Sequence, residues 1–154
     1  MKYKQLFYFT GHCLALDEHP EFREKVIERF QVEGADLENF VQLCSDHLII
    51  PAIYLKFKTH GLLEFLPEEL TQEFQKIYDL NRERNQQILK QIDDITAELN
   101  KENMQPVFLK GAANLLDGLY SDVGERMIGD IDFLVKEEKL KFHTPSKIFF
   151  AALN

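Results

Sequence analysis

Two aspartates two residues apart, Asp130 and Asp132, lie within the apolar stretch 128–135. Residues two apart in an extended strand share a face, so both carboxylates project together, while Ile131 and Phe133 point into a core on the other side. Neighbouring carboxylates repel each other, and a hard divalent cation relieves that repulsion, taking its other oxygens from water and substrate phosphates. The pair predicts a Mg²⁺ site, with Mn²⁺ as a second candidate ion. Two solvated aspartates on a sheet edge are the alternative.

A second polar feature, Lys110-Gly111, follows the apolar run 106–109 and precedes the helical stretch 112–120. A strand that turns through a glycine into a helix presents backbone N–H groups and the positive end of the helix dipole to an anion. Gly111 lets a ligand approach the backbone closely, and Lys110 adds a positive charge. The turn and the paired carboxylates together favour a phosphate ligand.

The elements that must position these residues are predicted from hydrophobic periodicity. Strands are expected at 106–109 and 128–135, and a helix at 112–120. The preceding hundred residues have helical spacing, with helices expected at 4–16, 20–30, 36–43, 49–59 and 67–102. The sequence therefore predicts a helix-dominated α+β (α/β) fold with a mixed sheet.

The longest predicted helix carries an apolar stripe that polar residues 81–85 interrupt at its middle. One interpretation is a solvated midsection or a kink. The other is a polar patch that faces a site, in which case Arg84 points toward the paired carboxylates, offsets their repulsion and meets a phosphate.

The stretches that carry this chemistry form a combined motif. They are Phe108-Leu109-Lys110-Gly111, Leu119-Tyr120-Ser121-Asp122, Arg126, and Gly129-Asp130-Ile131-Asp132-Phe133-Leu134-Val135. Together they resemble the uncharacterised bacterial nucleotidyltransferase-like family, which belongs to the polymerase-β-type nucleotidyltransferase superfamily. The superfamily pattern is a Gly-Ser turn at a helix start and an Asp-x-Asp or Asp-x-Glu strand. The resemblance extends over residues 3–139 and includes a helix junction at Asp46-His47-Leu48-Ile49-Ile50-Pro51.

The resemblance implies that a nucleoside monophosphate is transferred from an NTP to a hydroxyl or other acceptor, with one or two Mg²⁺ ions. It implies that Asp130 and Asp132 are catalytic metal ligands and that the Gly111 turn holds the β and γ phosphates. Lys110 is then a phosphate contact. Arg126 either stabilises the developing phosphoryl charge, pairs with Asp130, or is a solvated surface group. The acceptor, which could be a protein, an RNA end or a small molecule, is left open.

The chain also departs from the superfamily pattern. A third carboxylate normally comes from a later strand, whereas the only acidic residues after Asp132 are Glu137 and Glu138. We therefore expect a truncated chain that binds nucleotide better than it turns it over, with self-association as one way to complete the site. The predicted regions are a helical region at 1–104, the first part of a nucleotidyltransferase core at 105–139, and an atypical tail at 140–154.

Two other functions remain open from the sequence. The first is a noncatalytic nucleotide-binding module with a regulatory or toxin–antitoxin-type role, which the missing third carboxylate favours. The second is a nucleotide-sugar glycosyltransferase, because such enzymes also use Asp-x-Asp to hold a metal-bound diphosphate. The Lys110-Gly111 turn disfavours the second.

Composition excludes several classes of partner. A net charge of −8 and a pI near 5.1 disfavour nonspecific binding to duplex nucleic acid. No apolar run reaches the ~18 to 20 residues that a membrane span needs. Cys13 and Cys44 have no metal-ligand or redox spacing, and we expect both to be buried thiols in a reducing cytoplasm.

Overall fold

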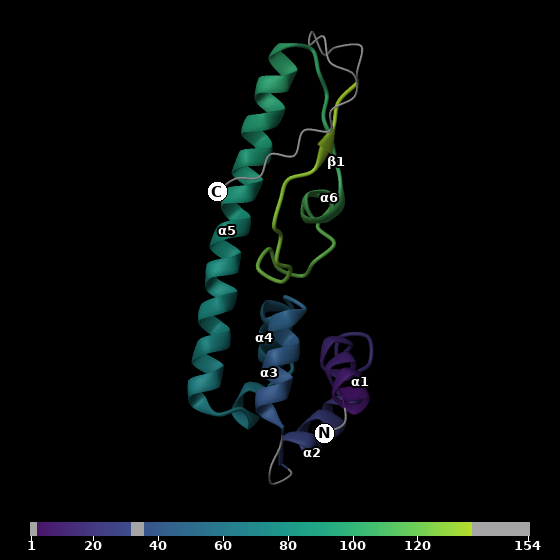
Figure 1. The fold of residues 1–154 in the computed structure, drawn as a ribbon, viewed down its shortest axis with the longest axis vertical. Coiled ribbons are helices and arrows are strands. Elements are labelled where there is room, and N and C mark those ends of the chain that lie inside the picture. Colours follow the sequence, from purple (N-terminus) through teal and green to yellow (C-terminus); the bar gives the residue numbers. More distant parts are fainter. Residues whose placement is uncertain (1–2, 32–35, 137–154) are drawn as a thin grey trace. The chain divides into compact units, whose positions relative to one another are not determined.

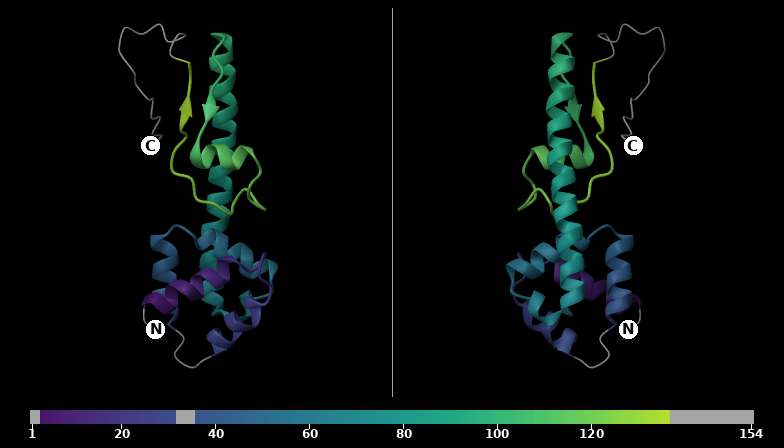
Figure 2. Two further views of the ribbon diagram at one scale, coloured as in Figure 1. Left: turned by 90° about the vertical axis from the view of Figure 1, so that its right-hand side faces the viewer. Right: turned by 90° about the vertical axis from the view of Figure 1, so that its left-hand side faces the viewer.

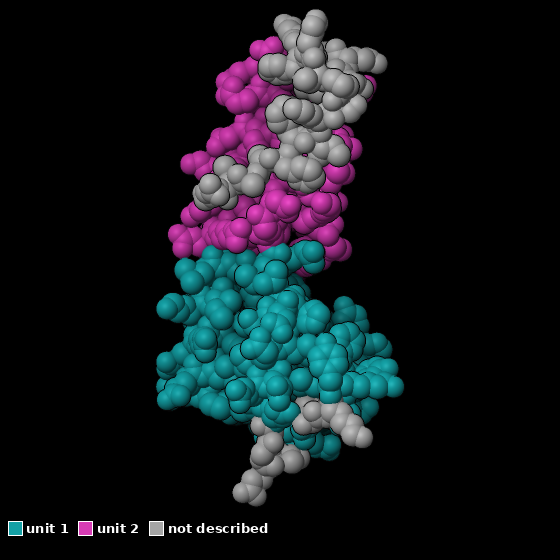
Figure 3. All heavy atoms as spheres, viewed as in Figure 1, with its two compact units in different colours: residues 1–81, 124–127 teal, residues 82–123, 128–154 magenta. Residues whose placement is uncertain are grey.

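The computed structural model describes residues 3–31 and 36–136. Over these residues the fold is helix-dominated with a small two-stranded antiparallel sheet, which confirms the predicted α+β class. The chain divides into two compact units (Figure 3). Unit 1 comprises residues 1–81 and 124–127, and unit 2 comprises residues 82–123 and 128–154. The division falls inside a continuous helix, so this helix contributes to both cores.

Unit 1 is a helical bundle around an aromatic core. Its elements are α1 (Tyr3–Leu14), α2 (Phe22–Gln31), α3 (Leu37–Asp46), α4 (Ile50–Thr59), the 3₁₀ turn η1 (Leu63–Phe65) and the first part of α5 (Glu68–Lys101). Phe40, Phe57 and Phe74 are fully buried at its centre. Pro51 stands in the first turn of α4, where its missing N–H costs nothing, and Gly61 follows the helix with a left-handed φ of +66°.

Unit 2 is built on the C-terminal part of α5. Beside that part of the helix lie β1 (Val107–Phe108), α6 (Lys110–Leu116) and β2 (Phe133–Leu134) (Figures 1 and 2). The strands are antiparallel, with Val107 opposite Leu134 and Phe108 opposite Phe133. The buried core of the unit consists of Ile88, Ile92, Ala112, Leu115, Ile128 and Ile131. The C-terminal part of the apolar stripe predicted on the long helix, with Ile88 and Ile92, therefore packs against the elements that carry the candidate site.

The predicted elements are all present, but the two strands are shorter than expected. Only two residues of each predicted strand pair in the sheet. Residues 128–131 precede β2 and are held by burial of Ile128 and Ile131 instead of by a continuous ladder. The helix predicted at 112–120 begins two residues earlier, at Lys110, and ends before Gly118, whose φ is +65°.

Cys13 and Cys44 are buried free thiols, and burial raises the pKa of Cys44 to about 12. None of the helices in the described part of the chain combines the length and apolar character that a bilayer crossing requires.

Candidate functional site

The candidate site in unit 2 begins where the two strands end. The backbone N–H of Leu109 donates to the carbonyl of Asp132 at 2.9 Å, which continues the β1–β2 pairing by one step. This bond places Lys110 next to Asp132. The Lys110 Nζ lies 2.7 Å from Asp132 Oδ2, and the Asp132 side chain is only 8% exposed. Asp132 is thus a buried carboxylate whose charge is compensated by an ammonium group from the neighbouring turn.

Both aspartates act electrostatically on the same lysine. The hydrogen bond and charge of Asp132 raise the pKa of Lys110, and the charge of Asp130 adds to this increase. Asp130 is exposed, while Ile131 between the two is buried in the core of unit 2. The arrangement offers one buried and one accessible carboxylate near a displaceable cation. No group of three His, Cys, Asp or Glu side chains suited to a metal occurs among the residues that the structure describes.

Gly111 has a packing role beside its predicted role at the phosphate turn. A Cβ atom at this position would lie 3.3 Å from both Cγ1 and Cγ2 of Ile128. The glycine therefore lets the start of α6 approach the segment that leads to Asp130. Lys110, directly before it, has a left-handed φ of +51°, a conformation that is uncommon for a residue with a side chain.

In unit 2, the polar midsection of α5 holds the loop that follows α6. Asn85 is fully buried and its Nδ2 donates to the carbonyl of Val123 at 2.6 Å. Arg84 Nη2 donates to the carbonyl of Gly129 at 3.3 Å, and Arg82 Nε lies 3.3 Å from Asp122 Oδ1. The interpretation of this midsection as simply solvated is wrong for the buried asparagine. Arg84 contacts the backbone of the residue that directly precedes Asp130.

In unit 1, residues 124–127 are held by side chains of the helical bundle. Asn81 is 4% exposed, and its Nδ2 donates to the carbonyls of Gly124 at 2.7 Å and Arg126 at 3.0 Å. Lys56 Nζ lies 3.2 Å from Glu125 Oε1, and both side chains are almost buried. Three consecutive residues of this segment are therefore fixed by contacts from α4 and α5.

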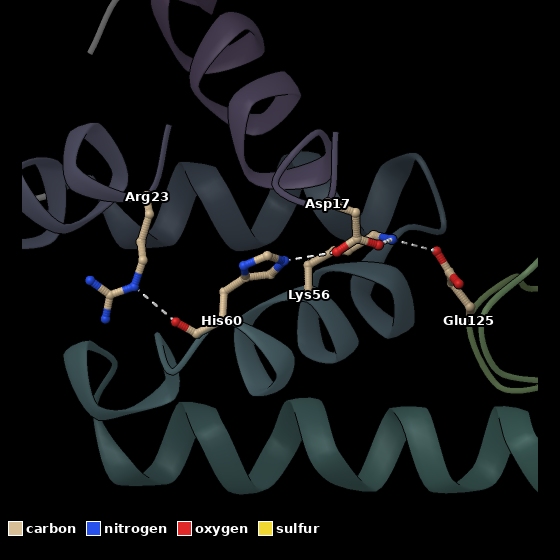
Figure 4. A network of polar contacts seen from close by, with 5 residues as sticks. All are labelled: Asp17, Arg23, Lys56, His60 and Glu125. Atoms are coloured by element: carbon tan, nitrogen blue, oxygen red, sulfur yellow. Dashed lines mark hydrogen bonds and ion pairs between the residues drawn. The ribbon is translucent and has the colours of Figure 1, made fainter. Parts of the chain in front are cut away.

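Lys56 also belongs to a wider polar network (Figure 4). Its Nζ lies 2.5 Å from Asp17 Oδ2, and His60 Nε2 lies 2.8 Å from Asp17 Oδ1. Arg23 Nε donates to the His60 carbonyl at 3.0 Å. Hydrogen bonds from Lys56 and His60 lower the pKa of Asp17. Burial by itself would lower the pKa of Lys56, but its hydrogen bonds to both carboxylates outweigh that effect and raise it.

The predicted site residues fall into two groups. Lys110, Gly111, Asp130 and Asp132 lie together in unit 2, and Arg84 of the same unit contacts the chain beside Asp130. Arg126 belongs to the segment that packs in unit 1, where its carbonyl accepts from Asn81 and its side chain is exposed. Glu137, Glu138 and the predicted tail at 140–154 lie outside the described residues.

Sequence reasoning missed Lys56, Asp17 and Glu125. One signal was available for Lys56, because Ile53 and Phe57 on either side of it belong to the buried face of α4. A lysine at such a position must find a carboxylate. Nothing in the local sequence identifies Glu125 as that partner, since the contact joins residues far apart in the chain.

Comparison with known proteins identifies the family of the chain. No curated protein and no solved structure matches the chain. A family model described as uncharacterised nucleotidyltransferase matches residues 33–143. This range includes the long helix, the Lys110-Gly111 turn and both candidate aspartates. The match covers well over half of the chain, and the chain therefore belongs to this nucleotidyltransferase family.

Proposed function

We propose that this protein transfers a nucleoside monophosphate from an NTP to an acceptor, with Mg²⁺ held by Asp130 and Asp132. The observation that carries the proposal is the buried Asp132 carboxylate 2.7 Å from the Lys110 ammonium, on which the charge of the exposed Asp130 also acts, in a member of a nucleotidyltransferase family. Mn²⁺ has the same ligand preferences and is a second candidate ion.

The donor set suits a hard divalent cation. Asp132 Oδ2 is buried, and its one ion-pair partner within the described residues is the solvent-exposed Lys110 ammonium. Mg²⁺ takes one or two protein carboxylates and completes its shell with water and substrate phosphates. When bound, it would activate the acceptor oxygen and neutralise charge on the leaving pyrophosphate.

The cationic residues have distinct parts in this proposal. Lys110 is 68% exposed on its side chain, so its ammonium can turn from Asp132 to a phosphate oxygen when the carboxylates bind a metal. Arg84 is exposed and touches the backbone beside Asp130, within the same unit. Its guanidinium has donors left to meet a phosphate. Gly111 keeps the turn close to Ile128 and leaves its backbone without a side chain.

Label transfer tests the proposed reaction. The purified chain is incubated with Mg²⁺, an extract of cells and each of four NTPs labelled at the α phosphate. Weak transfer of label to a macromolecular or small-molecule acceptor is expected from the wild-type chain, because the third carboxylate of the superfamily pattern is missing from the sequence, and it should be lost in Asp130→Asn and Asp132→Asn. Asp93→Asn is the matched control, because it removes the same charge from an exposed position on α5 in unit 2.

The same experiment, combined with a measurement of NTP binding, distinguishes nucleotidyl transfer from the second candidate function. Mg²⁺-dependent NTP binding without label transfer would indicate a noncatalytic nucleotide-binding module. Absence of both binding and transfer would refute a nucleotide site at Asp130 and Asp132.

A further inference from the structure

We infer that the Lys110 ammonium couples metal binding to nucleotide binding, because it competes with the metal ion for one oxygen of Asp132. The ammonium opposes binding of the metal by itself, and an NTP that draws the ammonium to its phosphates removes this opposition. The inference rests on the proposed function of the two aspartates and adds a regulatory device to that site. Lys110, Asp130 and Asp132 all belong to unit 2.

The first argument is that two cations need the same oxygen. Lys110 Nζ lies 2.7 Å from Asp132 Oδ2, and this oxygen is buried. Mg²⁺ binds carboxylate oxygens at about 2.1 Å and keeps several waters around itself. An ammonium in direct contact with the buried oxygen leaves no space for that shell, and the two positive charges repel each other. Asp132 therefore pairs through Oδ2 with the ammonium or with the metal, and not with both.

The second argument is that Asp132 needs a cation in either case. Its side chain is almost fully buried, and a buried carboxylate without a counter-charge is strongly disfavoured. Exchange of the ammonium for a metal ion keeps this charge compensated. Asp130 is exposed and its charge also acts on the ammonium, so it favours a cation of either kind beside it. Release of the ammonium and binding of the metal are therefore linked.

The third argument is that only the side chain of Lys110 has to move. On one side of it, the backbone N–H of Leu109 donates to the carbonyl of Asp132 at 2.9 Å. On the other side, Gly111 packs so closely to Ile128 that a Cβ atom would crowd it. The lysine side chain itself is mostly exposed, and its four-carbon stem is flexible. The ammonium can therefore leave Asp132 for a phosphate oxygen while the turn and the β pairing stay in place.

The backbone at position 110 supplies a suitable variant for a test. Lys110 has a left-handed φ of +51°, which glycine and asparagine adopt more readily than lysine does. Lys110→Asn therefore removes the ammonium without adding strain to the turn.

The test compares variants that lack the ammonium with controls in the full chain. Lys110→Met and Lys110→Asn remove the ammonium, and Lys110→Arg retains a positive charge on a side chain of similar length. Lys90→Met removes an exposed charge from α5 in the same unit. Asp132→Asn identifies binding that depends on the proposed metal ligand.

Two affinities are measured for each chain by calorimetric titration. The first is the affinity for Mn²⁺ without nucleotide, and the second is the affinity for ATP, GTP, CTP and UTP in the presence of Mn²⁺. Competition predicts changes of opposite sign, because the lysine opposes the metal and attracts the phosphates. A merely stabilising role of Lys110 would weaken both affinities in its variants.

We expect Lys110→Met and Lys110→Asn to bind Mn²⁺ alone about tenfold more tightly and to bind NTP about tenfold more weakly. Lys110→Arg and Lys90→Met should match the wild-type chain. The gain in Mn²⁺ affinity should disappear when Lys110→Met is combined with Asp132→Asn.

Mn²⁺ affinities that are unchanged or weaker in Lys110→Met and Lys110→Asn would overturn the competition and leave the proposed function in place. A wild-type chain that binds none of the four NTPs with Mn²⁺ would overturn the proposed function and the coupling together. The wild-type chain also provides a measurement that needs no variant. Titration with Mg²⁺ should shift the side-chain Cε–Hε NMR resonances of Lys110 together with the Asp130 amide, and a shift of the amide alone would overturn the competition.

Discussion

Replacing Gly111 by alanine tests the packing that brings the start of α6 to the segment before Asp130. The new methyl group would meet Cγ1 and Cγ2 of Ile128 at 3.3 Å and its Cδ1 at 3.6 Å. Ile128 is 4% exposed and packed in the core of unit 2, so it has little room to retreat. Gly111→Ala should therefore destabilise unit 2.

The size of the effect follows from two opposing contributions. Overpacking of a core typically costs about 1–3 kcal/mol. Alanine in place of glycine in a helix gains up to about 1 kcal/mol. The net expectation is a loss of roughly 1 kcal/mol in the free energy of unfolding. In an Ile128→Ala background the clash is absent, so Gly111→Ala should there be neutral or stabilising.

The wild-type chain, Gly111→Ala, Ile128→Ala and the double variant form a double-mutant cycle. Urea unfolding of these four chains measures the coupling free energy between the two positions, and hydrogen exchange of the α6 amides reports on the stability of unit 2. The clash predicts a coupling free energy on the order of 1 kcal/mol or more. Equal effects of Gly111→Ala in both backgrounds would refute the packing argument. Glycine at position 111 would then be explained by the accessible backbone that it gives the predicted phosphate turn and not by its packing against Ile128.

Arg84→Ala should weaken Mg²⁺–NTP binding on the order of tenfold at unchanged helicity by circular dichroism, and unchanged affinity would remove Arg84 from the site. The stability difference between the wild-type chain and Lys56→Met in urea should be constant from about pH 5 to 9. This stability difference should shrink at low pH, as the pH falls through the lowered pKa of Asp17, below 3.8. It should also shrink at high pH, as the pH rises through the raised pKa of Lys56, above 10.5. A stability difference that changes with pH near neutrality would contradict the pairing. Burial raises the pKa of the thiols of Cys13 and Cys44, so both should resist iodoacetamide at pH ~8 in the native chain and react in urea, and rapid native labelling would show that they are accessible.

Much of the fold could be predicted because its signals are local. The stripe that includes Ile88 and Ile92 has helical spacing, and both residues are buried on α5 as that spacing requires. Strand ends were less predictable. The apolar run 128–135 has the composition of a strand, but β2 comprises only Phe133–Leu134, with one further backbone hydrogen bond from Leu109 to Asp132. The length of a strand depends on how far its partner strand pairs with it, and a local sequence pattern carries no information about that partner.

The parts of the candidate site that depend on local sequence patterns were also predictable. The Asp-x-Asp pair and the Lys110-Gly111 turn are short-range patterns, and β pairing between Leu109 and Asp132 places them together. The polar interruption of α5 was visible, but the burial of Asn81 and Asn85 was not, because their acceptors lie about forty residues later in the chain. Side chains that hold a loop through its backbone carbonyls leave no sequence pattern at the loop, since every residue has a carbonyl.

Calorimetric titration of Mg²⁺ and NTP into the wild-type chain, Asp130→Asn and the Asp93→Asn control tests whether Asp130 and Asp132 hold a metal ion. Asp130 is exposed, so its replacement should leave the fold intact while removing one of the two proposed metal ligands. We expect Mg²⁺-dependent NTP binding by the wild-type chain and the control, and an affinity at least about tenfold weaker in Asp130→Asn. Equal affinities in all three chains would contradict a metal site at these aspartates.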